Sequence, residues 1–196
     1  MEKSTSIMFT IESWYVLVPV MLLGLLGLMI WTKRQNRKVT AVQFAVLITF
    51  GIYLLCMINL VLFPIEVNIG RYANQTPWYK TINFIPVLTI DITTFLLNVI
   101  MLIPFGMYIP LLLKGEISVK RMAKLGFGLS LSFEVVQLML RVVLGSGRST
   151  DINDLLANTA GAIIGFIIVR GLFRLKLFGG IIERLRLYPK KETINA

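Results

Sequence analysis

The chain has 196 residues, of which 56% are hydrophobic and only 15% are charged, whereas charged residues make up about 25% of an ordinary soluble domain. It contains no histidine, which excludes histidine-based acid–base catalysis, Ser–His nucleophiles and His-ligated metal sites. The formal net charge of +10 comes without a basic–aromatic recognition motif, so we predict no nucleic-acid partner. We predict an integral membrane protein instead.

The apolar residues lie in five long blocks rather than in amphipathic stripes. A helix needs about 20 predominantly apolar residues to cross a bilayer, and each block is close to that length. The blocks cover residues 13–31, 41–63, 92–113, 122–144 and 155–173. They predict an all-α bundle of five transmembrane helices that forms one membrane domain over residues 1–196.

Lysine and arginine are distributed unequally between the two sets of connections. They gather at 32–40, at 114–124 and from residue 170 onward, and they are sparse in the connections at 64–91 and 145–151. Basic residues mark the cytoplasmic side of a membrane protein. This pattern predicts an N-terminus outside the membrane and a cytoplasmic C-terminus.

The basic tail at 176–196 alternates basic and apolar residues after the last predicted span. One interpretation is an ordinary positively charged flank on the cytoplasmic side. The other is an interfacial helix that lies along the inner leaflet, where basic residues are attracted to anionic lipid.

Three predicted helices carry polar side chains on one face, toward the outer half of the membrane. The spacing is i, i+3, i+7 on the fourth and fifth helices and i, i+4 on the third, which keeps each set in line. The sets are Glu134, Gln137 and Arg141, then Asp151, Asp154 and Asn158, and finally Thr94 and Asn98. Polar groups are costly in lipid, so the simplest arrangement turns the three sets toward one another. This predicts a polar cleft open to the outer face.

Other roles stay open for the acids of this cleft. Asp151 lies at the start of the fifth helix, where a carboxylate can cap free N–H groups, and Asp154 can share that role. No cap explains Glu134 near the middle of its helix. Its alternatives are an interhelical hydrogen bond or a protonated acid.

Small residues and prolines in the third and fifth helices predict close packing. Gly161 and Gly165 form a GxxxG-like face, with Ala157 and Ala160 nearby. Glycine at such positions lets two helix backbones approach each other. In the third helix, Pro104 predicts a kink and Gly106 predicts another close contact.

Four separated motifs resemble the VanZ-like family of small bacterial membrane proteins. They are "NFIP" at 83–86, "NVIMLIPFG" at 98–106, "FEVVQ" at 133–137 and "RSTDINDLLANTAGAIIG" at 148–165. The resemblance therefore covers residues 83–165. The family's polar motif positions fall here on Asn83, Asn98, Glu134, Gln137, Arg148, Asp151, Asp154 and Asn158. Arg141 is outside the family pattern and is a candidate from its span alone.

The resemblance implies that the protein lies in the bacterial cell membrane and contributes to resistance against antibiotics that act on the cell envelope. The founding VanZ protein lowers susceptibility to teicoplanin, a glycopeptide anchored in the membrane by a fatty-acyl tail. We therefore expect the polar cleft to bind an envelope lipid, such as a lipid-linked cell-wall precursor, or the lipoglycopeptide itself. The expected binding residues are the eight family positions together with Arg141. Arg141 and Arg148 suit phosphate or carboxylate groups, because guanidinium binds both in a bidentate manner.

Two other functions are considered beside binding. The first is a membrane enzyme that acts on a lipid phosphate and holds Mg²⁺ through Glu134, Asp151 and Asp154. The second is a structural partner whose polar residues only hold the bundle together. The sequence predicts no catalytic residue, metal site or cofactor, and it leaves the oligomeric state and the enzyme question open.

Overall fold

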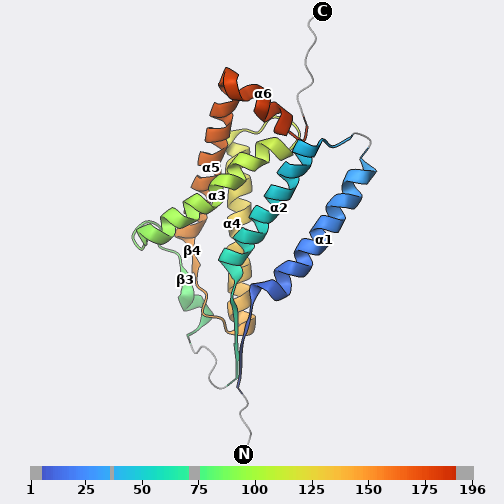
Figure 1. Cartoon of the computed structure of the whole chain (residues 1–196). Helices are drawn as coiled ribbons and strands as arrows, with labels where there is room; N and C mark the ends of the chain where they lie inside the picture. Colours follow the sequence, from blue (N-terminus) through green and yellow to red (C-terminus); the bar gives the residue numbers. More distant parts are fainter. Residues whose placement is uncertain (1–5, 36–37, 71–75, 189–196) are drawn as a thin grey trace, which may run out of the picture.

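The computed structural model describes residues 6–35, 38–70 and 76–188, without the side chains of 176–178. Its helices are α1 (Ser13–Arg34), α2 (Ala41–Leu62), α3 (Ile92–Leu112), α4 (Val119–Leu144), α5 (Ile152–Arg174) and the shorter α6 (Lys176–Leu185). Five of them, α1 to α5, are long and apolar enough to cross a membrane (Figure 1). The prediction of an all-α bundle with five spans is therefore confirmed, and the bounds agree to within three residues.

Polar residues and one glycine define where the long helices begin and end. The side chains of Asp91, Ser118 and Asp151 cap the first turns of α3, α4 and α5 by accepting backbone N–H groups. Hydrogen bonds from the hydroxyl and the N–H of Thr94 lower the pKa of the Asp91 carboxyl from its usual value. Gly145 ends α4 with a φ of 67°, a left-handed conformation that glycine adopts without steric cost.

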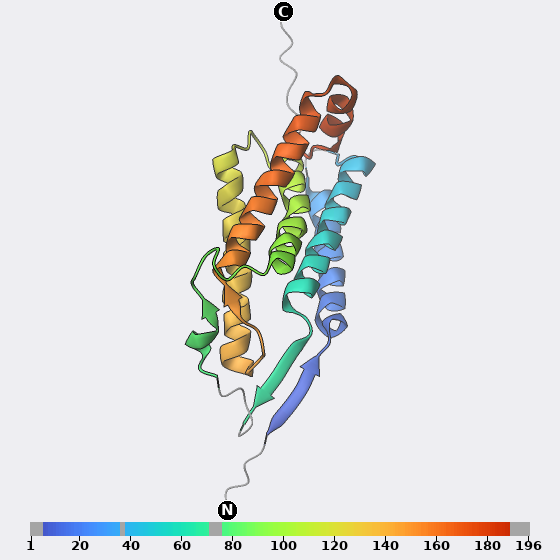
Figure 2. The ribbon, with the colours of Figure 1, turned by 90° about the vertical axis from the view of Figure 1, so that its left-hand side faces the viewer.

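Two small sheets lie at the end of the bundle where α2 stops and α3 begins (Figure 2). Strand β1 (Ile7–Ile11) pairs antiparallel with β2 (Ile65–Ile69), so that Ile7 faces Ile69. Strand β3 (Ile82–Asn83) pairs parallel with β4 (Thr150–Asp151), and the 3₁₀ helix η1 (Trp78–Thr81) precedes β3. We call this the sheet end and the opposite end the α6 end. The sheet end is the one predicted to face outward.

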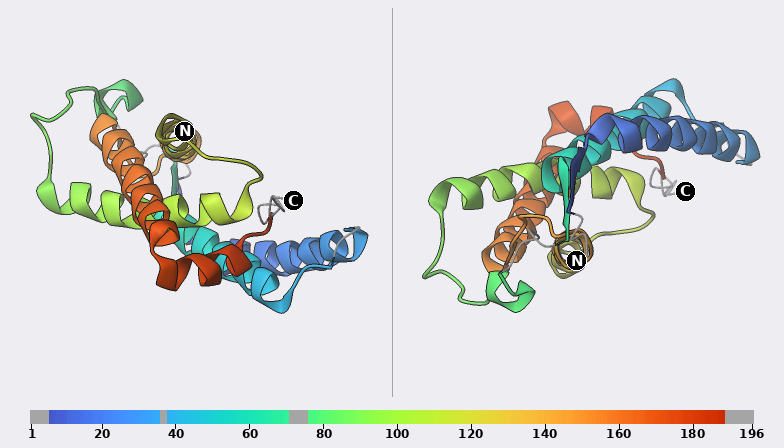
Figure 3. Two further views of the ribbon diagram at one scale, coloured as in Figure 1. Left: turned by 90° about the horizontal axis from the view of Figure 1, so that it is seen from above. Right: turned by 90° about the horizontal axis from the view of Figure 1, so that it is seen from below.

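Helix α1 stands beside α2 and apart from the rest of the bundle. None of its residues is buried, and in the view from above it extends away from the other helices (Figure 3). Its sequence is apolar around the whole circumference. A helix of this kind is stable in contact with lipid rather than with water.

The tightest packing in the bundle is between α3 and α5. A Cβ atom on Gly161 would collide with the carbonyl oxygen of Val99, and one on Gly165 with that of Ile103. A Cβ atom on Gly106 would meet the carbonyl of Ala162 in the same way. The predicted packing role of these glycines is confirmed. Helix α3 continues through Pro104 and Pro110.

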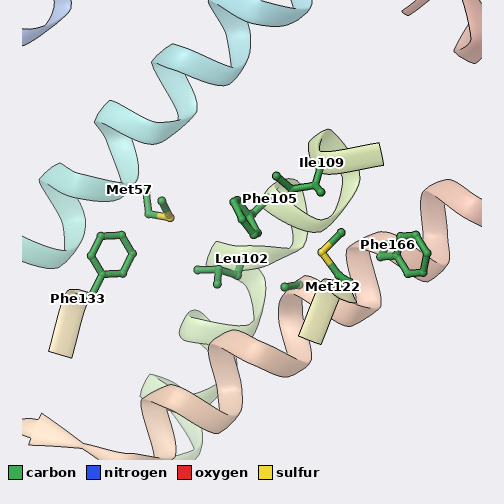
Figure 4. Packing of buried hydrophobic residues seen from close by; sticks show 8 residues of the cluster. Met57, Leu102, Phe105, Ile109, Met122, Phe133 and Phe166 are labelled. Atoms are coloured by element: carbon green, nitrogen blue, oxygen red, sulfur yellow. The ribbon is translucent and has the colours of Figure 1, made fainter. Parts of the chain in front are cut away.

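The hydrophobic core lies where α2, α4 and α5 meet the middle of α3 (Figure 4). Its buried members are Met57, Leu102, Phe105, Ile109, Met122, Phe133, Ala162 and Phe166. They come from four helices, so burial of their side chains holds the bundle around α3. The core lies between the sheet end and the α6 end.

Helix α6 and the residues after it fold back onto the ends of α2 and α3. The N–H of Leu187 donates to the carbonyl of Leu111 (2.7 Å), and the amide of Gln43 donates to the carbonyl of Arg186 (2.8 Å). Leu111 also packs with Ile182. The first half of the predicted basic tail is therefore helical and docked on the bundle, and residues 189–196 are outside the described part. Whether this tail touches lipid stays a prediction.

We expect Gln43→Ala to loosen this docking, because it removes the bond to Arg186 and one half of the capping box of α2. The cost is about 1–2 kcal/mol, so hydrogen exchange of the Leu187 amide should become about tenfold faster. Asn59→Ala changes an exposed polar residue of the same helix and should leave that exchange rate unchanged. Equal rates in the two variants would show that Gln43 does not hold the tail.

Candidate functional site

A cavity of about 450 Å³ opens near the sheet end among α2, α3, α4 and α5. We call it the α2–α5 cavity. Its polar lining consists of Thr94, Asn98, Glu134, Gln137, Arg148, Asp154 and Asn158. Its apolar lining consists of Leu60, Val61, Leu97, Ile100, Met101 and Phe133. Six of the nine expected binding residues thus lie around one space.

The acids at the start of α5 have different partners. Asp151 caps the helix, since its Oδ1 accepts the N–H of Asn153 at 2.8 Å. Asp154 lies one turn further and accepts a hydrogen bond from the side chain of Asn98 on α3 at 2.5 Å. Asp154 therefore joins the α5 and α3 walls of the cavity, while Asp151 caps α5 and also bonds to Asn83.

Glu134 is buried on α4, and its Oε2 accepts the N–H of Asp151 at 3.1 Å. This bond joins α4 to the N-cap residue of α5. Gln137, one turn later, donates to the carbonyl of Val61 at the end of α2 (3.0 Å). Together, Glu134 and Gln137 connect α4 with the start of α5 and with the end of α2.

Asn158 presents an unsatisfied acceptor at the cavity. Its Nδ2 donates to the hydroxyl of Ser130 at 2.9 Å. Its Oδ1 is buried and has no hydrogen-bond partner within the part of the chain that the structure describes. An unpaired buried carbonyl costs about 1–3 kcal/mol, so a small turn of the side chain that brought this oxygen to a donor in the cavity would be favourable.

Arg148 reaches the cavity from the loop between α4 and β4. Its Nη2 donates to the carbonyl of Phe63 at 3.0 Å, and that is the single hydrogen bond of its side chain among the described residues. A guanidinium carries five N–H donors, so most of its hydrogen-bonding capacity is free. It is the cationic group of the cavity lining.

Three of the expected binding residues lie outside the cavity. Arg141 is buried and donates to the carbonyls of Ser146 (3.2 Å), Arg148 (3.1 Å) and Thr76 (3.3 Å). It therefore holds the loops of the sheet end, and it lines a separate cavity of about 310 Å³. The side chain of Asn83 donates to Asp151 Oδ2 at 3.0 Å. This bond strengthens the β3–β4 pair.

Sequence reasoning missed two residues near the site. Ser130 is fully buried between Asn158 and the backbone of Asp154. It lies one turn before Glu134 on the same face of α4, so the helical spacing could have predicted that Ser130 belongs to the polar face. Asn153 accepts the N–H of Val87 at 2.9 Å. Val87 has a φ of 69°, which is rare for a β-branched residue and leaves no mark in the sequence.

The acids do not assemble into a metal site. A magnesium ion held by Glu134, Asp151 and Asp154 would need their carboxylate oxygens around one point. No group of three or more His, Cys, Asp or Glu residues in the described ranges could hold a metal ion. Asp151 has its oxygens bonded to Asn83 and Asn153, so the donor set gives the metal-dependent enzyme no support.

A protein-family model matches more than half of the chain. The family model described as VanZ/LLP1 matches residues 50–175. This range contains every residue that lines the α2–α5 cavity and stops before α6. No curated protein matches the chain. No solved structure matches it either.

Proposed function

Because the chain belongs to the VanZ/LLP1 family, we propose that it is a multi-pass protein of a bacterial cell membrane that lowers susceptibility to teicoplanin-type lipoglycopeptides. It does so by binding an envelope lipid or the drug in the α2–α5 cavity. The observation that carries the proposal is the convergence of Asn98, Glu134, Gln137, Arg148, Asp154 and Asn158 on this cavity. Intramembrane polar groups that share a cavity are a functional site by default.

The chemistry of the cavity suits a head group that combines hydrogen-bond donors with an anion. Glu134, Asp154 and Asn158 supply acceptor oxygens, which bind the hydroxyl and amide N–H groups of sugars and peptides. Arg148 supplies a guanidinium, which binds phosphate or carboxylate. Lipid-linked cell-wall precursors and lipoglycopeptides both carry such groups on a hydrocarbon anchor.

The location of the cavity also supports the proposal. It lies near the sheet end, which the distribution of lysine and arginine predicts to be outside. A lipoglycopeptide acts at the outer face of the membrane. A site at this depth would therefore meet the drug, or the lipid that the drug recognises, without transport across the membrane.

The test compares the binding of fluorescent teicoplanin to Gram-positive cells that carry the wild type, Asp154→Asn or an empty vector. We expect the wild type to lower drug binding if the cavity holds the envelope lipid and to raise it if the cavity holds the drug, and we expect Asp154→Asn to restore the empty-vector level in either case. Asparagine keeps the size of the side chain but removes the carboxylate that accepts from Asn98. Glu12→Gln neutralises an exposed acid at the sheet end outside the cavity and should behave like the wild type.

Membrane levels of each variant are measured in parallel. A purely structural role for the polar residues predicts that Asp154→Asn is depleted from the membrane. The binding proposal predicts normal abundance with loss of the effect on the drug. Equal drug binding by wild type, Asp154→Asn and empty vector at matched abundance would refute the proposal.

A further inference from the structure

The α2–α5 cavity has a polar interior and an apolar rim. Among its lining residues, Leu60 is 69% exposed, Leu97 61% and Ile100 59%. Leu60 belongs to α2, whereas Leu97 and Ile100 belong to α3. All three lie within helices long enough to cross the membrane, so lipid rather than water surrounds their exposed faces. The rim of the cavity therefore meets hydrocarbon.

Helices α2 and α3 are in contact on one side of the cavity and diverge on the other. Toward the α6 end, the hydroxyl of Tyr53 on α2 donates to the carbonyl of Met101 on α3 (2.7 Å). The ring of Tyr53 also stacks on Tyr108, with 6.1 Å between the ring centroids. Toward the sheet end the two helices diverge (Figure 1). Leu60 and Leu97 line the cavity there from these two helices.

The floor of this opening is formed by α4 and α5. Phe133, Glu134 and Gln137 come from α4, and Asp154 and Asn158 come from α5. A molecule that moves sideways from the bilayer between Leu60 and Leu97 would therefore meet polar groups behind an apolar rim. This order of surfaces matches an amphiphile that leads with its head group and leaves its chain in the lipid.

An unsatisfied group marks the position of the head. Asn158 is 3% exposed, lines the cavity and has a buried Oδ1 without a partner among the described residues. A small turn of its side chain would bring this oxygen to a ligand hydroxyl or amide N–H. Asp154 and Glu134 add further acceptors, and the free N–H groups of Arg148 suit an adjacent anionic group.

We propose that the cavity admits its ligand laterally from the bilayer between α2 and α3. The ligand is an amphiphile whose donor-rich head reaches Asn158 while its hydrocarbon chain lies across Leu60, Leu97 and Ile100. This inference rests on the proposed function, because it specifies what the same site binds and by which route. The acyl chain of a lipoglycopeptide and the polyprenyl chain of a lipid-linked precursor both satisfy this chemistry.

The test uses the purified full chain in lipid nanodiscs, with fluorescent teicoplanin and its deacylated form as probes. Leu97→Trp places a bulky side chain at the rim. Leu96→Trp makes the same change at an exposed neighbour that does not line the cavity. We expect Leu97→Trp to weaken binding of the acylated probe by about tenfold or more and Leu96→Trp to leave it unchanged. We also expect the deacylated probe to bind at least about tenfold more weakly to the wild type.

Competition with an unlabelled lipid-linked sugar pyrophosphate then shows whether the hydrocarbon chain at the rim comes from an envelope lipid or from the drug. If it displaces the acylated probe from the wild type, the lateral opening accepts the envelope lipid as well as the drug. If it displaces nothing while the acylated probe binds as expected, the opening accepts the drug. Either result supports lateral access.

Two other results would overturn the inference, and they differ in what they say of the proposed function. If both probes bind equally and Leu97→Trp matches the wild type while Asp154→Asn abolishes binding, lateral access is wrong and the site remains. If neither probe nor the lipid binds the wild type, both lateral access and the proposed function fail.

Discussion

Gly165→Ala is expected to remove most of the folded protein, although it adds only one methyl group. The new Cβ atom would overlap the backbone carbonyl of Ile103, and a backbone cannot move aside as a flexible side chain can. Separating α3 from α5 at this point should cost about 3 kcal/mol or more in free energy of unfolding. Thermal unfolding of the purified protein in detergent measures this loss.

The matched control for this variant is Gly171→Ala, on the same helix. A Cβ atom on Gly171 meets nothing within 4 Å, so alanine should be neutral or should stabilise the helix by up to about 1 kcal/mol. Gly161→Ala should resemble Gly165→Ala, because its Cβ would overlap the carbonyl of Val99. Similar melting temperatures for Gly165→Ala and Gly171→Ala would contradict the close α3–α5 contact.

Arg141→Met is expected to be the second most damaging change. It leaves the carbonyls of Thr76, Ser146 and Arg148 without their guanidinium donor. Hydrogen bonds to a charged group contribute about 1.5–3 kcal/mol each, so we expect a loss of at least about 3 kcal/mol in free energy of unfolding. The backbone amides of the loop after α4 should also exchange their hydrogens faster in this variant. Denaturant unfolding measures the first effect and mass spectrometry the second.

Two further variants separate geometry from charge at this position. Arg141→Lys keeps the positive charge, but a single ammonium cannot reproduce the planar fork of donors, so its stability should lie between those of the wild type and Arg141→Met. Arg121→Met removes an exposed arginine from the same helix and should change stability little. If Arg141→Met were as stable as Arg121→Met, the buried bonds would not hold the sheet end.

The parts of the fold that depend on local pattern could be predicted from the sequence. Five apolar blocks of membrane length give α1 to α5, and the small residues Gly161 and Gly165 give the close-packing face of α5. The helical spacing of Glu134 with Gln137 and of Asp154 with Asn158 placed these residues on faces that line one cavity. Each of these features is a property of a single helix, which periodicity describes directly.

The parts that depend on distant pairing could not be predicted in this way. The strands β1 and β2 are short, and each is stabilised by a partner far along the chain. Arg141 shares the spacing of Glu134, yet it bonds to loop carbonyls whose positions follow from the tertiary fold. The same holds for Asn83, whose partner Asp151 is brought to it by the β3–β4 pair. The spacing of a residue identifies the helix face on which it lies, whereas its hydrogen-bond partners depend on how the loops fold.

The measurement that tests the central claim most directly is chemical labelling of the cavity from outside the cell. Thr94 lines the cavity and is exposed near the start of α3. Thr94→Cys is made in a Cys56→Ser background, since Cys56 is the single native cysteine. Lys38→Cys, in the connection before α2, is the control for the opposite side of the membrane.

Intact cells are treated with a membrane-impermeant thiol reagent, with and without teicoplanin. An outward-facing binding cavity predicts that Thr94→Cys is labelled in intact cells, that teicoplanin slows this labelling, and that Lys38→Cys is labelled only after permeabilisation. Labelling of Thr94→Cys only after permeabilisation would place the cavity on the cytoplasmic side and contradict the account.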